Sequence, residues 1–497
     1  MYKKIVSLLA SSLFFWFVWV LSLLQAAWIA LVSRYPMAFD EAHHYDVIKL
    51  HAEKWGPLIL RQPPGPATYG PLARDPSYLY HYVMSFPYRL LDAIGLNDQT
   101  IIICLRFLSI AMFAVGLLLF RKLLQKTKAS NAAINAAFLF FIMIPTVPLL
   151  AGQLNYDNLQ FPLMALAMLL TVNFAQKLKK RKIDLSLLVQ ILVVCMLGSI
   201  NKFTFLPVIT AVALYLTFVL TKFYLSNRKR AIKAVKNDWR ALSSLRRRVL
   251  VGSLAIATGF FVWSYGVNIA LYRNPVPPCH VVLGKEKCRD LGTWDRNDKA
   301  AANNKGVDPN PIRFSFNWLN GMQYRLFFTI NGASGEKRYQ NHMAMGITTA
   351  ASILAIVGAV LLLRYGKRIL SNDPAFVCML FVSLFYIATV WARNYNDYLH
   401  LGQMLAINGR YLQPMLLPIV LLLIASYQWA FRTMPGVKLG ILFVSFALFL
   451  SGGGIIGFVH YSDADWYFES NLLILQLHEF AKKIVAPLFL WKTGGSI

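Results

Sequence analysis

The chain has 497 residues, of which 57% are hydrophobic and only 14% are charged, and it carries a net charge of +28. Soluble domains contain about 25% charged residues, whereas apolar runs long enough to cross about 30 Å of hydrocarbon recur along this chain. The composition excludes an ordinary soluble domain and predicts an all-α protein that crosses a membrane many times.

The predicted membrane spans begin with the apolar run 5–32. This run is too long for the apolar region of a signal peptide, and no small-x-small cleavage pattern follows it, so we expect it to be retained as the first helix. Ten further spans are predicted at about 100–120, 132–150, 159–176, 184–200, 204–225, 249–271, 345–364, 374–392, 412–431 and 438–459. The expected fold is a bundle of about 11 membrane helices.

The loops between these spans alternate in charge. Short basic loops at 1–4, 121–128, 177–182, 222–248, 364–368 and 432–438 hold 26 of the 50 Lys and Arg residues, and the only acidic residues in or near them are Asp184, Asp238 and Asp373. By the positive-inside rule this face is cytoplasmic and includes the N-terminus. The basicity therefore reflects topology and attraction to anionic membrane lipids, and no nucleic-acid partner is expected.

The opposite, outer face carries nearly all of the titratable chemistry. All nine histidines fall there, as do 19 of the 22 acidic residues. The predicted organisation is a six-span N-terminal module 1–225 with the first outer loop 33–99, a basic cytoplasmic loop 226–248, a five-span module 249–459 with the outer loop 272–344, and an outer tail 460–497. We expect any active site on the outer face.

The five cysteines divide between the membrane and an outer loop. Cys104, Cys195 and Cys378 fall inside apolar runs, where a thiol packs as a small hydrophobe. Cys279 and Cys288 lie nine residues apart in the polar loop 272–344, and two cysteines do not make a zinc site. A disulfide between them is expected if this loop faces an oxidising compartment.

Two helices are predicted in the first outer loop, both lying on the membrane surface. In the first, the apolar stripe is formed by His44, Val47, Ile48, His51, Ala52 and Trp55, at spacings of three and four. The second follows Asp75-Pro76, a good N-cap and first-turn pair. Its apolar face is predicted to be Leu79, Tyr82, Val83 and Phe86.

Three carboxylates at the outer membrane edge are candidate catalytic groups. Asp40 and Glu41 directly follow the first span, and Asp157 precedes the fourth. A carboxylate near apolar surroundings can act as a general base. The alternative is that Asp40 and Glu41 cap the helix that begins near Ala42, and that Asp157 or Asn158 caps the fourth span.

Cationic residues at the same depth are candidates for binding a lipid phosphate. Lys202 lies in a tight outer hairpin, Arg410 and Tyr411 stand at the outer end of the tenth span, and Arg393 ends the ninth. The planar guanidinium of Arg suits phosphate oxygens. The alternatives are that Lys202 extends to lipid headgroups and that the arginines anchor the interface.

The remaining polar residues of these loops are candidates for holding a sugar or an acceptor. They are His43, His44, Asn155, Asn158, Arg74 and Tyr82. Glu41 and His81 are candidate ligands for a divalent metal such as Mg, Mn or Zn, although no tight ligand spacing supports a metal cofactor. No nucleotide cofactor is expected, because no phosphate-binding glycine loop is placed for one.

Several of these motifs together resemble the GT-C superfamily of integral membrane glycosyltransferases, which includes protein O-mannosyltransferases and the aminoarabinose transferase of lipid A. The shared features are Asp-Glu directly after the first helix ("FDEAHHYD"), a large first outer loop, an acidic residue in the second outer turn ("NYDN") and a hairpin turning at Lys ("GSINKFTFLP"). The segment "NGRYLQPMLLP" is similar to one in bacterial GT-C-like proteins. The resemblance implies that Asp40 is the catalytic carboxylate and that Asp157 helps to place the acceptor or a metal.

The function that this resemblance implies is sugar transfer from a polyprenyl-phosphate-linked donor to a glycan, lipid or protein acceptor, by inverting single displacement. The site would face the periplasm or exterior of a bacterial inner membrane. Two alternatives remain. One is a transporter or flippase, which usually has repeated halves and polar groups at mid-membrane. The other is a polymerase or ligase of lipid-linked glycans.

Overall fold

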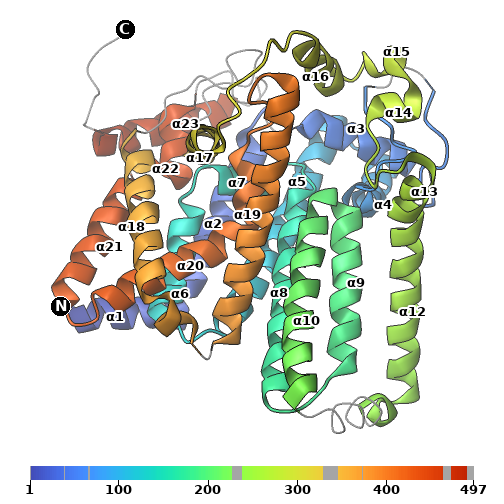
Figure 1. The fold of residues 1–497 in the computed structure, drawn as a ribbon. Coiled ribbons are helices and arrows are strands. Elements are labelled where there is room, and N and C mark those ends of the chain that lie inside the picture. Colours follow the sequence, from blue (N-terminus) through green and yellow to red (C-terminus); the bar gives the residue numbers. More distant parts are fainter. Residues whose placement is uncertain are drawn as a thin grey trace.

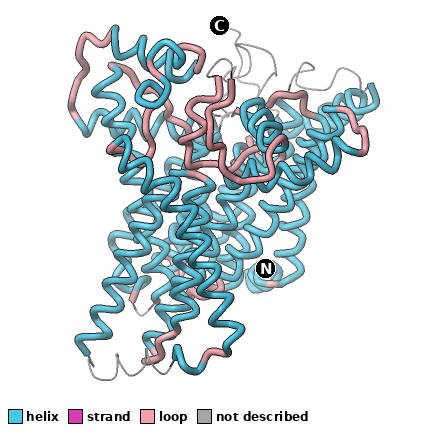
Figure 2. Tube along the Cα trace, turned by 90° about the vertical axis from the view of Figure 1, so that its right-hand side faces the viewer, coloured by secondary structure: helices cyan, strands magenta, loops and turns pink. Residues whose placement is uncertain are grey.

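The computed structural model describes residues 2–37, 40–64, 68–226, 238–327, 345–371, 373–450, 452–462 and 472–489. Within these ranges the chain forms helices joined by loops, and none of it forms a β-strand (Figures 1 and 2). Nine helices of the described chain are long and apolar enough to cross a membrane. The expectation of an all-α protein with many membrane helices is therefore confirmed.

The nine candidate spans follow the predicted order. They correspond to α2 (Ser12–Val32), α5 (Asp98–Leu124), α8 (Asp157–Lys179), α10 (Leu206–Ser226), α12 with α13 (Ser244–Phe261 and Val267–Tyr272), α18 (Met345–Leu370), α19 (Pro374–Leu401), α20 (Gln413–Ala430) and α21 (Pro435–Leu450) with α22 (Gly454–Tyr461). The predicted count of eleven is not confirmed. The predicted span at 132–150 divides into α6 (Asn131–Ile142) and the short α7 (Thr146–Ala151), and that at 184–200 is the 17-residue α9 (Leu185–Asn201).

The first predicted helix, 5–32, is broken in two. Helix α1 (Tyr2–Ala10) ends before Ser11, whose hydroxyl accepts a hydrogen bond from the Phe14 amide at 3.1 Å and thereby caps α2. Because Ser hydroxyls compete with helical backbone hydrogen bonds, a serine inside an apolar run can start a new helix. Helix α1 packs against α6 and α21.

The N-terminal helices share a closely packed core centred on α5 and α8. The rings of Phe113, Phe141 and Phe161 stack at centroid distances between 5.1 and 6.5 Å. A Cβ on Gly116 would lie 2.3 Å from the Phe161 ring, so only glycine lets the two helices approach this closely. This core fixes the positions from which the outer loops extend.

The first outer loop contains the two predicted helices at one end of the bundle, α3 (Glu41–Ala52) and α4 (Leu79–Ala93) (Figure 1). The stripe of α3 is buried as predicted at His44, Val47, Ile48 and His51. The predicted face of α4 is wrong. Its buried residues are Tyr80, His81, Met84, Ser85 and Tyr88, whereas Val83 and Phe86 are exposed.

The second outer loop adds α14 (Cys279–Leu283), α15 (Lys285–Cys288), α16 (Gly292–Ala302) and α17 (Pro311–Phe327), and α23 (Leu472–Val485) follows in the tail. A disulfide joins Cys279 and Cys288 with an S–S distance of 2.03 Å, which confirms the predicted pairing. Cys195 and Cys378 are buried thiols. The loops at this end of the bundle lie together in Figure 2.

Candidate functional site

An ion pair between Asp40 and Arg410 joins the first outer loop to the start of α20. Asn408 places Arg410 in a short 3-10 turn, Gly409–Leu412, by accepting a hydrogen bond from its amide at 3.1 Å. The Nη2 of Arg410 donates to the Oδ2 of Asp40 at 2.7 Å. The Arg410 side chain is 7% exposed, so it is not an interface anchor.

Asp40 keeps an accessible carboxylate in this pair. Its side chain is 58% exposed, and although it stands at the N-cap position of α3, it makes no capping hydrogen bond. The capping alternative for Asp40 is therefore wrong. Burial opposes ionisation of Asp40, but the Arg410 charge and hydrogen bond outweigh it and lower the pKa of the carboxyl. Asp40 is thus an ionised carboxylate that a second molecule can reach.

A second ion pair, Asp157–Lys202, lies buried beside the first. The Lys202 Nζ lies 2.5 Å from Asp157 Oδ1, and each side chain is only 3% exposed. The same ammonium lies 4.4 Å from the centre of the Tyr156 ring and 5.2 Å from that of Tyr411. Lys202 therefore does not extend to headgroups, and Asp157 pairs with it instead of capping α8.

The two ion pairs interact electrostatically. Burial lowers the pKa of the Lys202 ammonium, Asp157 opposes this shift, and the positive charge of Arg410 adds to it. Arg410 and Lys202 also share the ring of Tyr411, with the Arg410 guanidinium 5.4 Å from its centre. Two cations from distant parts of the chain are thus held around one aromatic residue. We call Asp40, Arg410, Asp157, Lys202 and Tyr411 the charged cluster.

Glu41 lies directly behind the charged cluster and is fully buried. Its carboxylate accepts two hydrogen bonds from Arg106 of α5, at 2.8 and 2.7 Å. The amides of Met37 and Leu154 donate to the same carboxylate at 2.7 and 3.1 Å. Glu41 therefore ties the chain on both sides of Asp40 to α5 and to the loop that precedes Asp157. Its hydrogen bonds hold the backbone next to Asp40 in place.

The histidines form a buried cluster beside α4. His44 Nδ1 and His81 Nε2 are 2.9 Å apart, and His44 packs edge-on against the Tyr156 ring at 4.5 Å. Burial keeps the pKa values of His44 and His81 well below the usual range, so both are neutral. No group of three or more His, Cys, Asp or Glu side chains in the described chain could hold a metal ion. With Glu41 paired to Arg106, the residues present do not fit the expected divalent metal.

Four further predicted site residues lie outside the charged cluster or support its backbone. Asn155 accepts from the Asp157 amide at 2.9 Å, and the Asn158 amide group donates to the Leu150 and Gln153 carbonyls. Tyr82 is turned away and donates to the Trp55 carbonyl at 3.1 Å. Arg393 is 62% exposed, 3.9 Å from Asp397, with its guanidinium over the ring of Phe203, the residue after Lys202.

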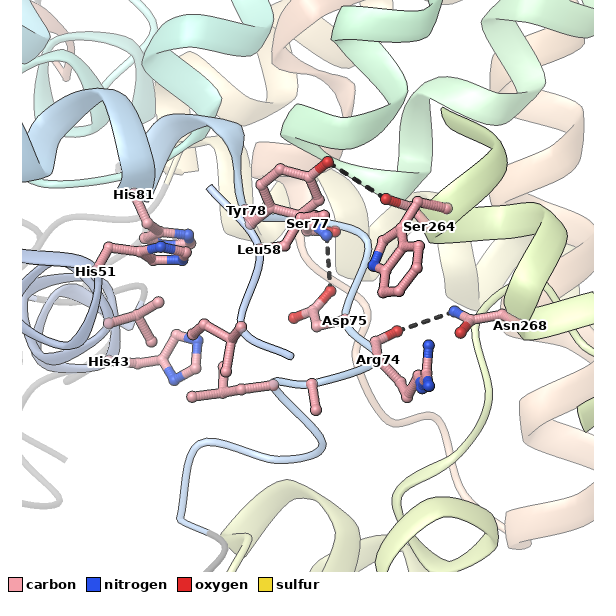
Figure 3. A pocket seen from close by; sticks show the side chains of 15 residues that line it. His43, His51, Leu58, Arg74, Asp75, Ser77, Tyr78, His81, Ser264 and Asn268 are labelled. Atoms are coloured by element: carbon pink, nitrogen blue, oxygen red, sulfur yellow. Dashed lines mark hydrogen bonds between the residues drawn. The ribbon is translucent and has the colours of Figure 1, made fainter. Parts of the chain in front are cut away.

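A small polar cavity adjoins the histidine cluster and contains the carboxylate of Asp75, which was predicted only as a helix cap (Figure 3). Asp75 accepts a hydrogen bond from the Ser77 amide at 2.8 Å, while α4 begins only at Leu79. Burial raises the pKa of Asp75. The two predicted residues His43 and Arg74 also line the cavity, whose volume is about 30 Å³.

The far wall of this cavity comes from a π-helical turn, Val262–Gly266, between α12 and α13. It presents Trp263 and Ser264, and Ser264 donates to the Tyr78 hydroxyl at 3.4 Å (Figure 3). Such turns often occur at functional sites. Burial lowers the pKa of His43, and the carboxylates of Asp75 and Asp40 oppose this shift.

Comparison of the chain with models of known protein families, with curated proteins and with solved structures gives no match. The protein is therefore characterised by its own fold and site. In the described chain the protein is helical, with nine candidate membrane spans. Two ion pairs lie at one end of its bundle, of which Asp157–Lys202 is buried and Asp40–Arg410 has an accessible carboxylate.

Proposed function

We propose that this protein is a membrane glycosyltransferase of the GT-C type, which transfers a sugar from a polyprenyl-phosphate-linked donor to an acceptor hydroxyl at the outer face of the membrane. The observation that carries this proposal is the pairing of the accessible Asp40 carboxylate with the buried Arg410 at 2.7 Å. A base and a phosphate-binding cation at one membrane edge are the two groups that such a transfer needs.

The proposed reaction is a single displacement at the anomeric carbon. Asp40 accepts the proton of the acceptor hydroxyl, the acceptor oxygen bonds to the anomeric carbon, and the bond from that carbon to the phosphate oxygen breaks. The polyprenyl phosphate leaves with the electron pair of the broken bond. Arg410 and Lys202, whose side chains are buried, stabilise its charge.

The Asp40–Arg410 pair supports a coupling between donor binding and base strength. A donor phosphate that binds Arg410 competes with Asp40 for the same guanidinium. Asp40 would then lose the hydrogen bond and part of the positive charge that lower its pKa. Its basicity would rise at the moment when the donor is in place, so the empty enzyme holds the base in a less reactive state.

Two roles assigned to other residues follow from their positions. Asp157 holds Lys202 beside Tyr411, so that the ammonium reaches the phosphate in one orientation. Glu41, paired with Arg106, positions the backbone that carries Asp40. No step is assigned to a metal, since the residues present do not form a ligand set.

The test is Asp40→Asn, which keeps the shape of the side chain and removes the base. The purified protein is assayed in lipid vesicles with polyprenyl-phosphate-linked hexoses, N-acetylhexosamines and pentoses, and release of polyprenyl phosphate is measured. We expect turnover to fall by at least about 100-fold, the usual contribution of a general base.

The matched control is Asp308→Asn, the same change at a partly exposed outer carboxylate paired with Arg313. It should leave turnover unchanged. If well-folded Asp40→Asn protein kept full activity, the proposed mechanism would be wrong. If the protein instead used only a polyprenyl-diphosphate-linked glycan as donor and released polyprenyl diphosphate, the polymerase or ligase alternative would be favoured.

A further inference from the structure

A cavity lined by the described residues lies among the membrane helices and has no part in the proposed reaction. It encloses about 520 Å³ and is partly open to the surroundings. Its walls come from α1, α6, α17, α18, α20 and α21. Of the α20 residues, Leu416, Ile419, Leu423, Tyr427 and Phe431 line it, so it follows one face of that helix for about 22 Å at 1.5 Å per residue.

The chemistry of the lining identifies hydrocarbon as the occupant. Most lining residues are apolar, including Leu326, Phe327, Leu354 and Phe449. An apolar cavity does not hold ordered water, because water needs polar partners. A membrane protein has only one abundant apolar neighbour, and that is lipid. A length of about 22 Å exceeds half of a bilayer core of about 30 Å, so a whole acyl chain fits.

The helices that form the cavity leave room for such a chain. In the candidate spans that contain α18 and α21, only 22% and 29% of the residues are buried inside the protein, compared with 72% for α8. The α18 residues that line the cavity, Ala351, Leu354 and Ala355, are only partly buried. The apolar surfaces of α18 and α21 are therefore left for lipid to cover, whereas α8 is largely surrounded by protein.

The single charge on the cavity wall tells which end holds the headgroup. Lys438 is the one charged residue among the described residues that line the cavity. It stands in the first turn of α21, where the helix dipole also favours an anion. Its ammonium lies 5.4 Å from the centre of the Tyr2 ring. Among the described residues, no carboxylate forms an ion pair with it.

Lys438 belongs to the basic loop 432–438, which the charge distribution assigns to the cytoplasmic face, and Lys3 and Lys4 on α1 lie at the same end. A lipid bound there therefore has its negative headgroup in the cytoplasmic leaflet and its chain between α1 and α20. We infer that this cavity is a binding site for an anionic phospholipid of the cytoplasmic leaflet. The inference is independent of the sugar-transfer reaction.

The experiment measures lipid retention by native mass spectrometry. The full chain is reconstituted with phosphatidylcholine, with or without phosphatidylglycerol, and then extracted in mild detergent. We expect the protein to retain phosphatidylglycerol and not phosphatidylcholine. Lys438→Gln should lower this retention about fivefold, the effect of one Lys beside an anionic lipid surface, whereas Lys182→Gln, at an exposed cytoplasmic lysine, should leave it unchanged.

A second pair of variants tests the cavity itself. Ala355→Phe places a ring in the cavity and should abolish retention, whereas Ala359→Phe on the same helix, outside the lining, should not. Equal retention by all folded variants would overturn the inference. It would also be overturned if added polyprenyl phosphate, but not phosphatidylglycerol, were retained, because the cavity would then belong to the donor.

Discussion

Asp40 has a backbone dihedral that is uncommon for a side-chain-bearing residue, with φ of 70°. Asp tolerates this left-handed region better than most residues, although the conformation still raises the energy of the folded state. Such strain is often found at functional positions. Here the conformation directs the Asp40 carboxylate away from α3, which it precedes, and toward Arg410. The two residues next to this carboxylate, Glu41 in sequence and Arg410 in space, are both buried.

The low pKa of Asp40 leads to a prediction about pH dependence. A general base acts only when ionised, and Arg410 favours the ionised form, so kcat/KM should remain constant as pH falls until it passes below the usual carboxyl value of 3.8. Arg410→Gln should move this acidic limb upward by about one to three pH units. Arg410→Lys, which keeps the charge, should move it less. If the acidic limb of kcat/KM lay at the same pH in the unmodified protein, Arg410→Gln and Arg410→Lys, the proposed effect of Arg410 on the pKa of Asp40 would be contradicted.

The same coupling predicts a difference between two kinetic profiles of the unmodified protein. The acidic limb of kcat, which reports the complex with bound donor, should lie at higher pH than that of kcat/KM, which reports the free enzyme. The reason is that a bound phosphate takes over the Arg410 hydrogen bonds.

At the scale of the element, the short turn before α20 depends on Gly409. A Cβ at this position would lie 2.4 Å from the Met322 carbonyl oxygen and 2.9 Å from the Leu326 amide, both backbone atoms of α17. Backbone atoms cannot move aside as a flexible side chain can. Any residue larger than glycine must therefore shift the turn that carries Arg410.

Gly409→Ala should accordingly lower turnover by about 100-fold, since displacement by about 1 Å near a reacting group has an effect of this size. The control is Gly436→Ala in α21, where a Cβ would meet nothing within 4 Å. Turnover with a polyprenyl-phosphate-linked sugar and thermal unfolding are measured for both. Unchanged turnover in Gly409→Ala would show that the position of Arg410 does not limit the reaction.

Helix periodicity predicted the elements well where one face is buried and the other is exposed. The stripe of α3 is such a case. It failed on α4, where aromatic residues occupy both faces, because hydrogen bonds decide the orientation instead. The Tyr80 hydroxyl lies 2.8 Å from that of Ser109 and accepts from the Asn155 amide. Such partners are far away in the sequence, so spacing does not reveal them.

The candidate site was predictable as a set of residues but not as a set of pairs. Asp40, Asp157, Lys202 and Arg410 were all selected because charge is costly at a membrane edge. Their partners depend on tertiary contacts. Arg106 is a charge inside the predicted span 100–120, and its pairing with Glu41 explains why that charge is tolerated there. Asp75 was missed as a cavity residue because its following proline suggested a helix start.

At the scale of the whole molecule, the disulfide gives a direct test of orientation. Disulfides persist in oxidising compartments, so the end of the bundle that holds the charged cluster and the Cys279–Cys288 loop should face away from the cytoplasm. In intact cells, a membrane-impermeant reductant followed by an impermeant maleimide should label these two cysteines. Labelling only after the cells are broken would reverse the assigned topology, and Cys195 and Cys378, both buried, should stay unlabelled in either case.

The separation of 370 residues between Asp40 and Arg410 also fixes an order of events during synthesis. At about 5–20 residues per second, Asp40 emerges roughly 20–75 s before its partner. The delay between the synthesis of Glu41 and that of its partner Arg106 is much shorter, because Arg106 follows only 65 positions later. Arg106, which pairs with Glu41, is thus synthesised early, whereas Arg410, which pairs with Asp40, is synthesised late. A nascent chain that has inserted only its first half carries the Asp40 carboxylate without Arg410 beside it. Under the proposed reaction, we therefore expect activity only after the second half is in the membrane.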